Sequence, residues 1–151
     1  MKVTVKTTGF AELDRALADI EKAATAKAIM RRALKQAAQP MADMASSLAP
    51  VGATGTLAPS VTVGTKLSKR QKGMHRKMFR DDKASVEMFV GAGPLASAHN
   101  QEFGNDHHGP QPFMRPAFDA EAKPTVDRLG KEMWAEIDKA AKRAAKRAAK
   151  G

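Results

Sequence analysis

Histidine and acidic side chains gather at one place in the chain, at Asp106, His107 and His108. Imidazole nitrogens and carboxylate oxygens are common ligands of transition metals, so this segment is a candidate metal site. Adjacent side chains rarely converge on one ion, however, and the following Gly109 and Pro110 indicate a loop. We therefore expect no bound metal and interpret the two histidines as loop residues.

The sequence lacks the motifs that carry common enzyme chemistry. It contains no Walker-type phosphate loop, no nucleophile elbow, no HExxH helix and no acidic cluster with metal spacing. With no cysteines, thiolate nucleophiles, disulfides and thiolate zinc sites are excluded. His75 and His99 are expected to be surface or interface residues. We predict that the chain is not an enzyme and needs no cofactor.

Cationic side chains dominate the composition. The 151 residues include 26 Lys and Arg against 16 Asp and Glu, which gives a formal net charge of +10. Such an excess attracts polyanions, either nucleic acid or an acidic protein surface. Six Phe, one Trp and no Tyr argue against a platform for stacking single-stranded bases.

A run of positive charge lies in Lys66–Lys83, a connection too long for a tight hairpin. We expect a basic loop here. Its charge would suit a phosphate backbone, while a solvated, flexible loop is the alternative. The candidates for facing a partner or DNA are Lys66, Lys69, Arg70, Lys72, Arg76, Lys77 and Arg80.

A second basic stretch, residues 139–151, is almost entirely Ala, Lys and Arg. These are strong helix formers, and cations are favoured near a helix C-terminus, so we predict that the last helix continues into this tail. The basic stripe of the tail is either a solvated face or a DNA contact. It consists of Lys139, Lys142, Arg143, Lys146, Arg147 and Lys150.

Alternating apolar and polar residues predict the strands, and spacings of three and four predict the helices. The expected strands are residues 2–8, 60–67 and 84–91, with a further short strand or extended edge at 95–103. The expected helices are residues 10–20, 23–49 and a terminal helix with Pro124 in its first turn.

The helix expected at residues 23–49 contains Pro40, which should kink it. Its apolar seam would pack on the protein's own sheet or against a symmetry mate, and consists of Met30, Leu34, Ala37, Met41, Met44 and Leu48. The buried face expected for the terminal helix is Val126, Leu129, Met133 and Ile137, with Trp134 on its flank.

Together these elements predict one α+β domain over residues 1–138, followed by the basic tail. Its antiparallel sheet would have about four strands, with the long kinked helix and the C-terminal helix packed on it. No run is long enough for a membrane span, and the N-terminus lacks the apolar core of a signal peptide. We therefore expect cytosolic synthesis and no membrane partner.

The Pro-rich segment Glu102–Pro116 is predicted to be a rigid turn that docks the terminal helix. Phe113 and Met114 would be its apolar anchors. Arg115 would form either a local salt bridge or carbonyl cap, or an ion pair between subunits. The candidates for oligomer contacts or docking are Glu102, Phe103, Phe113, Met114 and Arg115.

Several motifs, taken in order, resemble those of siphophage neck proteins, the head–tail joining or tail-completion proteins often called minor tail proteins. These motifs are GFAELDRAL at 9–17, LAPV at 48–51, TGTL at 54–57 before the 60–63 strand segment, EFG at 102–104 and PFMRPA at 112–117. The resemblance covers nearly the whole chain.

The resemblance implies a structural virion protein of a tailed phage or prophage, assembled in the host cytoplasm. Copies would form a homo-oligomeric ring, expected to be a hexamer, between the head connector or stopper and the tail terminator or tube proteins. Duplex DNA would pass transiently through the channel. A tail terminator that caps the tube is one alternative, and a basic, non-specific DNA-binding protein is another.

Overall fold

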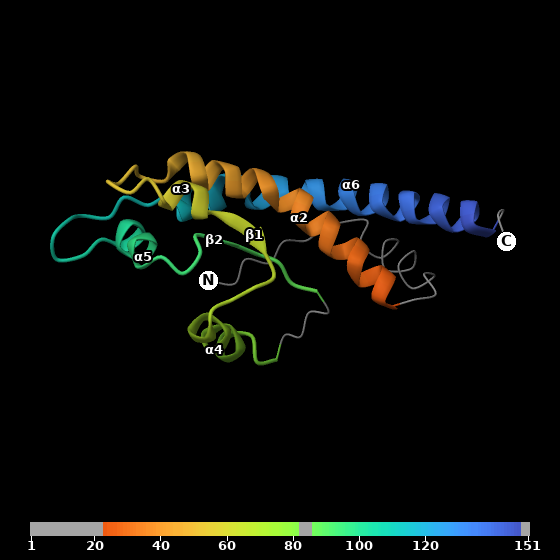
Figure 1. The fold of residues 1–151 in the computed structure, drawn as a ribbon, viewed down its shortest axis with the longest axis horizontal. Helices are drawn as coiled ribbons and strands as arrows, with labels where there is room; N and C mark the ends of the chain where they lie inside the picture. The colour runs from red at the N-terminus through yellow and green to blue at the C-terminus, as the bar shows by residue number, and fades with distance from the viewer. Residues whose placement is uncertain (1–22, 82–85, 149–151) are drawn as a thin grey trace.

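The computed structural model describes residues 23–81 and 86–148. Its elements, in chain order, are α2 (Ala23–Leu48), α3 (Leu57–Ser60), β1 (Thr62–Gly64), α4 (Lys69–Met78), β2 (Phe89–Gly91), α5 (Ala96–Phe103) and α6 (Met114–Ala148). Helices α2 and α6 run side by side as one long pair, and the shorter elements gather around one end of it (Figure 1). The strand expected at 2–8 and the helix expected at 10–20 lie outside the described residues.

The α2–α6 pair is antiparallel. Near the start of α2, Ala33 packs with Met133 in the second half of α6. Near its end, Ala45 belongs to the same buried cluster as Phe113 and Ala117, where α6 begins. The same cluster includes Val63 of β1, so the small hairpin and both long helices share one core.

The seam predicted for α2 is wrong by about one position. The buried residues along the helix and just past its end are Ile29, Ala33, Ala37, Ala42, Ala45 and Ala49. Of the predicted seam only Ala37 is buried, and Leu48 is 46% exposed. Alanine at the interface allows two backbones to approach closely, so the larger side chains lie on the flanks. The buried positions step by five between Ala37 and Ala42, across Pro40, which lies inside α2 as expected.

The sheet is smaller than predicted. β1 pairs antiparallel with β2, with Val63 opposite Val90, which confirms the pairing expected for the segments 60–67 and 84–91 in shortened form. The described residues contain this two-stranded sheet and no larger one. Residues 96–103, expected as a strand or edge, form helix α5. That segment has no β-branched residue, so it lacks the side chains that favour strands.

Two other predictions are wrong about where helices form or begin. The basic connection is not only a loop, because α4 forms within it. Ser68 caps α4 reciprocally: its hydroxyl accepts from the Gln71 N–H, and the Gln71 side chain accepts from the Ser68 N–H. The terminal helix begins at Met114, so Pro124 lies in its interior rather than in its first turn.

The later part of α6 agrees with its prediction. Met133 is buried, and Val126, Leu129 and Ile137 are partly buried. The helix continues to Ala148, with residues 141–147 exposed. No helix in the described ranges has the length and apolar character to cross a membrane.

An ion pair and a hydrogen bond connect α6 to α2. The buried Glu136 carboxylate accepts from Arg32 Nε at 2.7 Å and from Lys139 Nζ at 2.9 Å. Hydrogen bonds from Arg32 and then Lys139 hold the pKa of Glu136 below its ordinary value despite burial. Arg128 of α6 donates to the Ala37 carbonyl at 3.2 Å. The pair is therefore held by polar contacts as well as by alanine packing.

Candidate functional site

The Glu102 carboxylate, at the end of α5, receives the N-terminus of α6. Its Oε2 accepts from the backbone N–H groups of Phe113 and Met114 at 2.8 and 2.9 Å. Its Oε1 accepts from the N–H of Arg115 at 3.1 Å. Glu102 is 5% exposed. One buried carboxylate thus caps a helix whose first residue lies 12 positions away in sequence.

Helix physics explains this arrangement. The first N–H groups of an α-helix have no acceptor within the helix, and the helix dipole concentrates positive potential there. Phe113, just before α6, is fully buried, so water cannot serve these donors well. Pro116 lies in the first turn, where its missing N–H costs little. Glu102 supplies both the missing acceptor and the opposite charge.

The hydrogen bonds also determine the charge state of Glu102. Burial raises the pKa of its carboxyl, but the N–H groups of Phe113 and Met114, followed by Arg115, together outweigh burial. The pKa of Glu102 therefore lies below its ordinary value of 4.5. Glu102 is ionised at neutral pH.

Arg115 closes the cluster from outside. Its Nε donates to Glu102 Oε1 at 2.8 Å, and its terminal NH2 group donates to the Glu102 carbonyl at 2.7 Å. Its guanidinium carbon lies 5.1 Å from the centroid of the Phe103 ring, within cation–π range. The local salt bridge and the carbonyl cap, one of the two alternatives for Arg115, are both present in the single chain.

Gly104 allows the chain to turn out of α5 beside this cluster. Its backbone has φ 78° and ψ 172°, a region open essentially to glycine alone. A Cβ here would also lie 2.9 Å from the Pro110 nitrogen. The EFG motif therefore places a carboxylate, an aromatic ring and a required glycine in the order that the helix junction needs.

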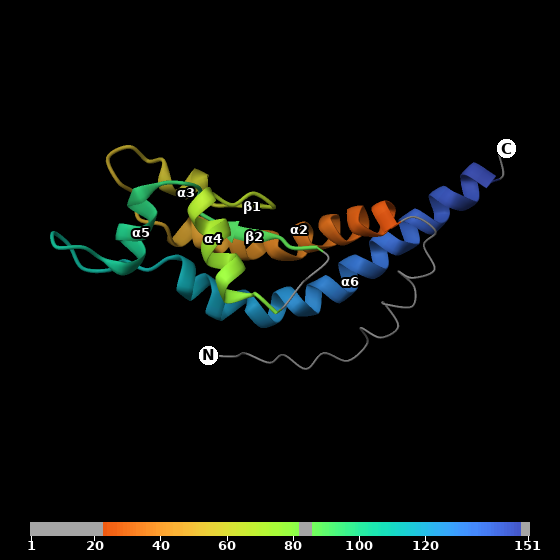
Figure 2. The same cartoon turned by 90° about the horizontal axis from the view of Figure 1, so that it is seen from below.

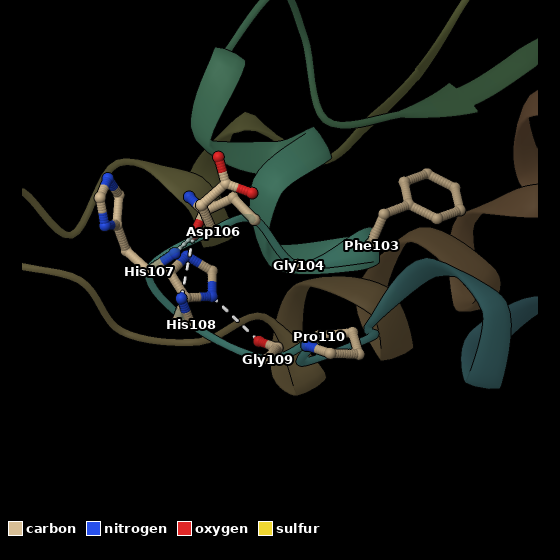
Figure 3. Close-up of a pocket in the computed structure, with 8 residues that line it drawn as sticks. Phe103, Gly104, Asp106, His107, His108, Gly109 and Pro110 are labelled. Carbon is tan, nitrogen blue, oxygen red and sulfur yellow. Dashed lines mark hydrogen bonds between the residues drawn. The ribbon is translucent and has the colours of Figure 1, made fainter.

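The loop from Asn105 to Pro110 projects at one end of the molecule and is internally ordered (Figure 1). The Asn105 side chain accepts from the N–H groups of His107 and His108 at 2.9 and 3.0 Å. Figure 3 shows the side chains of Asp106, His107 and His108 pointing in different directions around a shallow, open hollow. Across the described part of the chain, no three His, Asp, Glu or Cys side chains gather as a metal site requires.

The basic candidates lie on a separate element. In Figure 1, α4 lies on the hairpin's side of the α2–α6 pair and is set apart from the pair; in Figure 2, seen from below, α4 lies in front of the hairpin. All seven predicted cations are exposed, and α4 has no buried residue. They lie on or close to this one helix, which brings none of them to the Glu102 cluster.

The structure thus divides the predicted residues into two groups. Glu102, Phe103, Phe113, Met114 and Arg115 form one junction around the start of α6. The cations form another group on and around α4. Contacts of either group with a partner stay predictions.

Some residues of structural importance were missed from sequence. The Glu136 pair with Arg32 joins residues 104 positions apart, and no local pattern announces it. The α4 helix, in contrast, had a readable signal, because Ser68 followed three residues later by Gln71 is a capping-box pattern.

A match to a known family identifies the class of protein. Residues 11–104 match the family described as "Bacteriophage HK97-gp10, putative tail-component". The chain belongs to the HK97-gp10-like family. The expected phage resemblance is confirmed at this level, as a structural tail component rather than an enzyme. No curated protein and no solved structure matches the chain.

The match to the HK97-gp10-like family ends at Gly104, the last residue of the EFG motif. It therefore includes Glu102 but not the α6 N–H groups that Glu102 caps. The capping contact connects the matched region to the part of the chain that follows it.

Proposed function

We propose that this tail component is the subunit of a homo-oligomeric ring at the head–tail junction of a tailed phage or prophage. In this tail-completion role the ring lies between the head connector or stopper and the tail terminator or tube, and duplex DNA passes through it. Six-fold order is the expected symmetry. The protein is then part of the virion.

The observation that carries this proposal is the exposure of large apolar side chains where α2 ends and α6 begins. Val51, just after α2, is 91% exposed, and Phe118 in the early part of α6 is 53% exposed. Leu48 and Phe103 add 46% and 58% exposure at the same end of the molecule. Apolar side chains gathered on one region favour contact with another protein surface.

The composition of the core supports the same conclusion. Much of the α2–α6 interface is alanine, and Phe113 and Ile29 are the largest side chains that are fully buried in the described ranges. Alanine buries little apolar area, so such a core contributes less hydrophobic stabilisation than one built from Leu and Phe. A subunit of this kind gains from burying further surface against identical neighbours.

Light scattering coupled to size exclusion, with electron microscopy of the main peak, tests the proposal. The wild-type chain is expected to form a closed ring, alone or on addition of its tail proteins. The double variant Val51→Ser with Phe118→Ser should lose the ring. The control, Met74→Ser with Met78→Ser, removes two exposed apolar side chains from α4 and should keep the ring.

Two outcomes would contradict the proposal. A monomer or dimer that binds DNA tightly and never joins tails would favour the basic DNA-binding protein instead. Density for the chain at the end of the tail tube in an intact particle, capping it, would favour the tail terminator.

A further inference from the structure

Helix α4 separates its charges from its other side chains. At about 100° per residue, Lys69, Lys72 and Arg76 follow one another along one face. Arg70 and Lys77 flank this face, and all five side chains are exposed. We call these five residues the α4 cationic face. The five positive charges within the 10 residues of α4 therefore lie on one side of the helix.

The opposite side of α4 makes the contacts with the body. His75 Nε2 lies 3.3 Å from Glu87 Oε1. The His75 ring packs against Phe89 of β2, edge to face, at 5.3 Å between centroids, and against Phe79 at 4.8 Å. Because His75 contacts the hairpin, the cationic face turns away from it.

The α4 cationic face also differs from the other basic stretch in its pairing. In α6, Lys139 pairs with Glu136 and Lys142 with Asp138. None of the five cations of the α4 face has a salt bridge to any residue in the described ranges. Their charge is available to an external anion.

We propose that the α4 cationic face binds the sugar–phosphate backbone of duplex DNA, without reading bases. A row of exposed Lys and Arg suits regularly spaced phosphates, and it needs no aromatic side chain on the same face. Gly73 lies between Lys69 and Lys77 on this face, and there is open space where its Cβ would be. A phosphate can therefore approach the helix closely. This inference rests on the proposed function only in one respect, because the proposed ring is what brings duplex DNA to the protein.

The binding should be weak and salt-sensitive. Ten residues of helix span about 15 Å, enough for roughly three phosphate contacts. Each contact releases counterions, so about three contacts give a slope near −3 in a plot of log affinity against log salt. DNA that must move through a channel requires contacts of this kind.

The test uses a labelled duplex of random sequence and fluorescence anisotropy at several salt concentrations. The α4 variant changes its five cations to glutamine: Lys69→Gln, Arg70→Gln, Lys72→Gln, Arg76→Gln and Lys77→Gln. The control variant changes five cations of the basic tail: Lys142→Gln, Arg143→Gln, Lys146→Gln, Arg147→Gln and Lys150→Gln. Both variants lose the same net charge, so a difference between them reports position.

We expect the α4 variant to bind at least tenfold more weakly at low salt and to lose about three units of slope. The control should lose less than threefold. Equal losses in both variants would overturn the proposal, because binding would then follow net charge. An α4 variant that binds DNA normally but fails to join tails would also overturn it, in favour of an acidic protein partner.

Light scattering on the same samples separates this proposal from the ring. Loss of DNA binding with the assembly state unchanged supports the α4 cationic face whatever that state is. A chain that forms no ring yet loses DNA binding only in the α4 variant would contradict the ring alone.

Discussion

The Glu102 junction and helix α4 both carry charged side chains, but these side chains differ in burial and in pairing. At the junction, the carboxylate is buried and satisfied by three backbone N–H groups and Arg115. On α4 the cations are exposed, and the helix contacts the hairpin through His75. Charge at the junction holds the fold, and charge on α4 stays exposed on the surface.

The two regions differ in what explains their residues. The motif residues EFG and PFMRPA meet one another within a single chain, so their pattern is explained by folding. The five cations of the α4 face form no salt bridge with any described residue. We therefore expect changes at the Glu102 junction to alter stability strongly. Changes on α4 should alter binding while leaving global stability almost unchanged.

The largest effect is expected from Glu102→Ala. The change leaves three helix N–H groups without their acceptor beside the fully buried Phe113, and it removes the salt bridge to the Arg115 guanidinium. We expect a loss of about 3 kcal/mol in the free energy of unfolding, measured by urea denaturation. Asp106→Asn, in the exposed loop, is the control and should change stability by less than about 0.5 kcal/mol. A loss at Glu102 as small as that of the control would mean that the cap is not important.

A somewhat smaller effect is expected from Gly104→Ala. The new Cβ must occupy a backbone region that only glycine adopts readily, and it meets the Pro110 nitrogen at 2.9 Å. The cost should be about 2 kcal/mol by urea denaturation. Gly109→Ala, in the same loop but with open space around its Cβ position, is the matched control and should be nearly neutral. Equal costs at the two glycines would show that the turn does not need the conformation described.

Acid should weaken the junction. The folded pKa of Glu102 lies below its ordinary value of 4.5, so its contribution to stability is complete above that pH and is lost as the pH falls through the folded pKa. Glu102→Gln should therefore flatten the decrease in unfolding free energy between about pH 5 and pH 2. Glu136→Gln should flatten it independently, because the pKa of Glu136 is also lowered. A decrease as steep in the double variant as in the wild type would assign acid sensitivity to other groups.

The sequence predicted the two long helices and the pairing of two strands better than it predicted individual contacts. The helix at 23–49, the pairing of the two central strands and the apolar face of the last helix are periodic over several turns or alternations. Such patterns are read reliably because many residues agree. The role of Phe113 was also readable, since a large apolar residue in a Pro-rich turn before a helix needs a place in the core.

The errors have physical causes. At α5, a segment without β-branched residues was expected to be extended, although its composition permits a helix. In α2, the larger Met and Leu residues defined the predicted seam, but close packing against α6 selected alanines one position away. The Glu102 cap could not be predicted as a contact, because no local rule says which carboxylate meets a helix terminus 12 residues later.

The smallest predicted effect compares one substitution in the two kinds of helix. Gly73 in α4 and Gly130 in α6 both lie inside helices with open space at the Cβ position. Alanine is favoured over glycine there by about 1 kcal/mol. In α6, which shares the core with α2, Gly130→Ala should raise the global unfolding free energy by that amount.

In α4, Gly73→Ala should instead slow hydrogen exchange of the helix amides by about fivefold, as about 1 kcal/mol requires, without changing global unfolding. The difference arises because α4 buries no residue and can open while the α2–α6 core stays folded. Urea denaturation and amide exchange, measured on both variants, distinguish the two responses. If Gly73→Ala stabilised the whole protein as much as Gly130→Ala, α4 would unfold with the core, and its cations could not be regarded as lying on an independent surface.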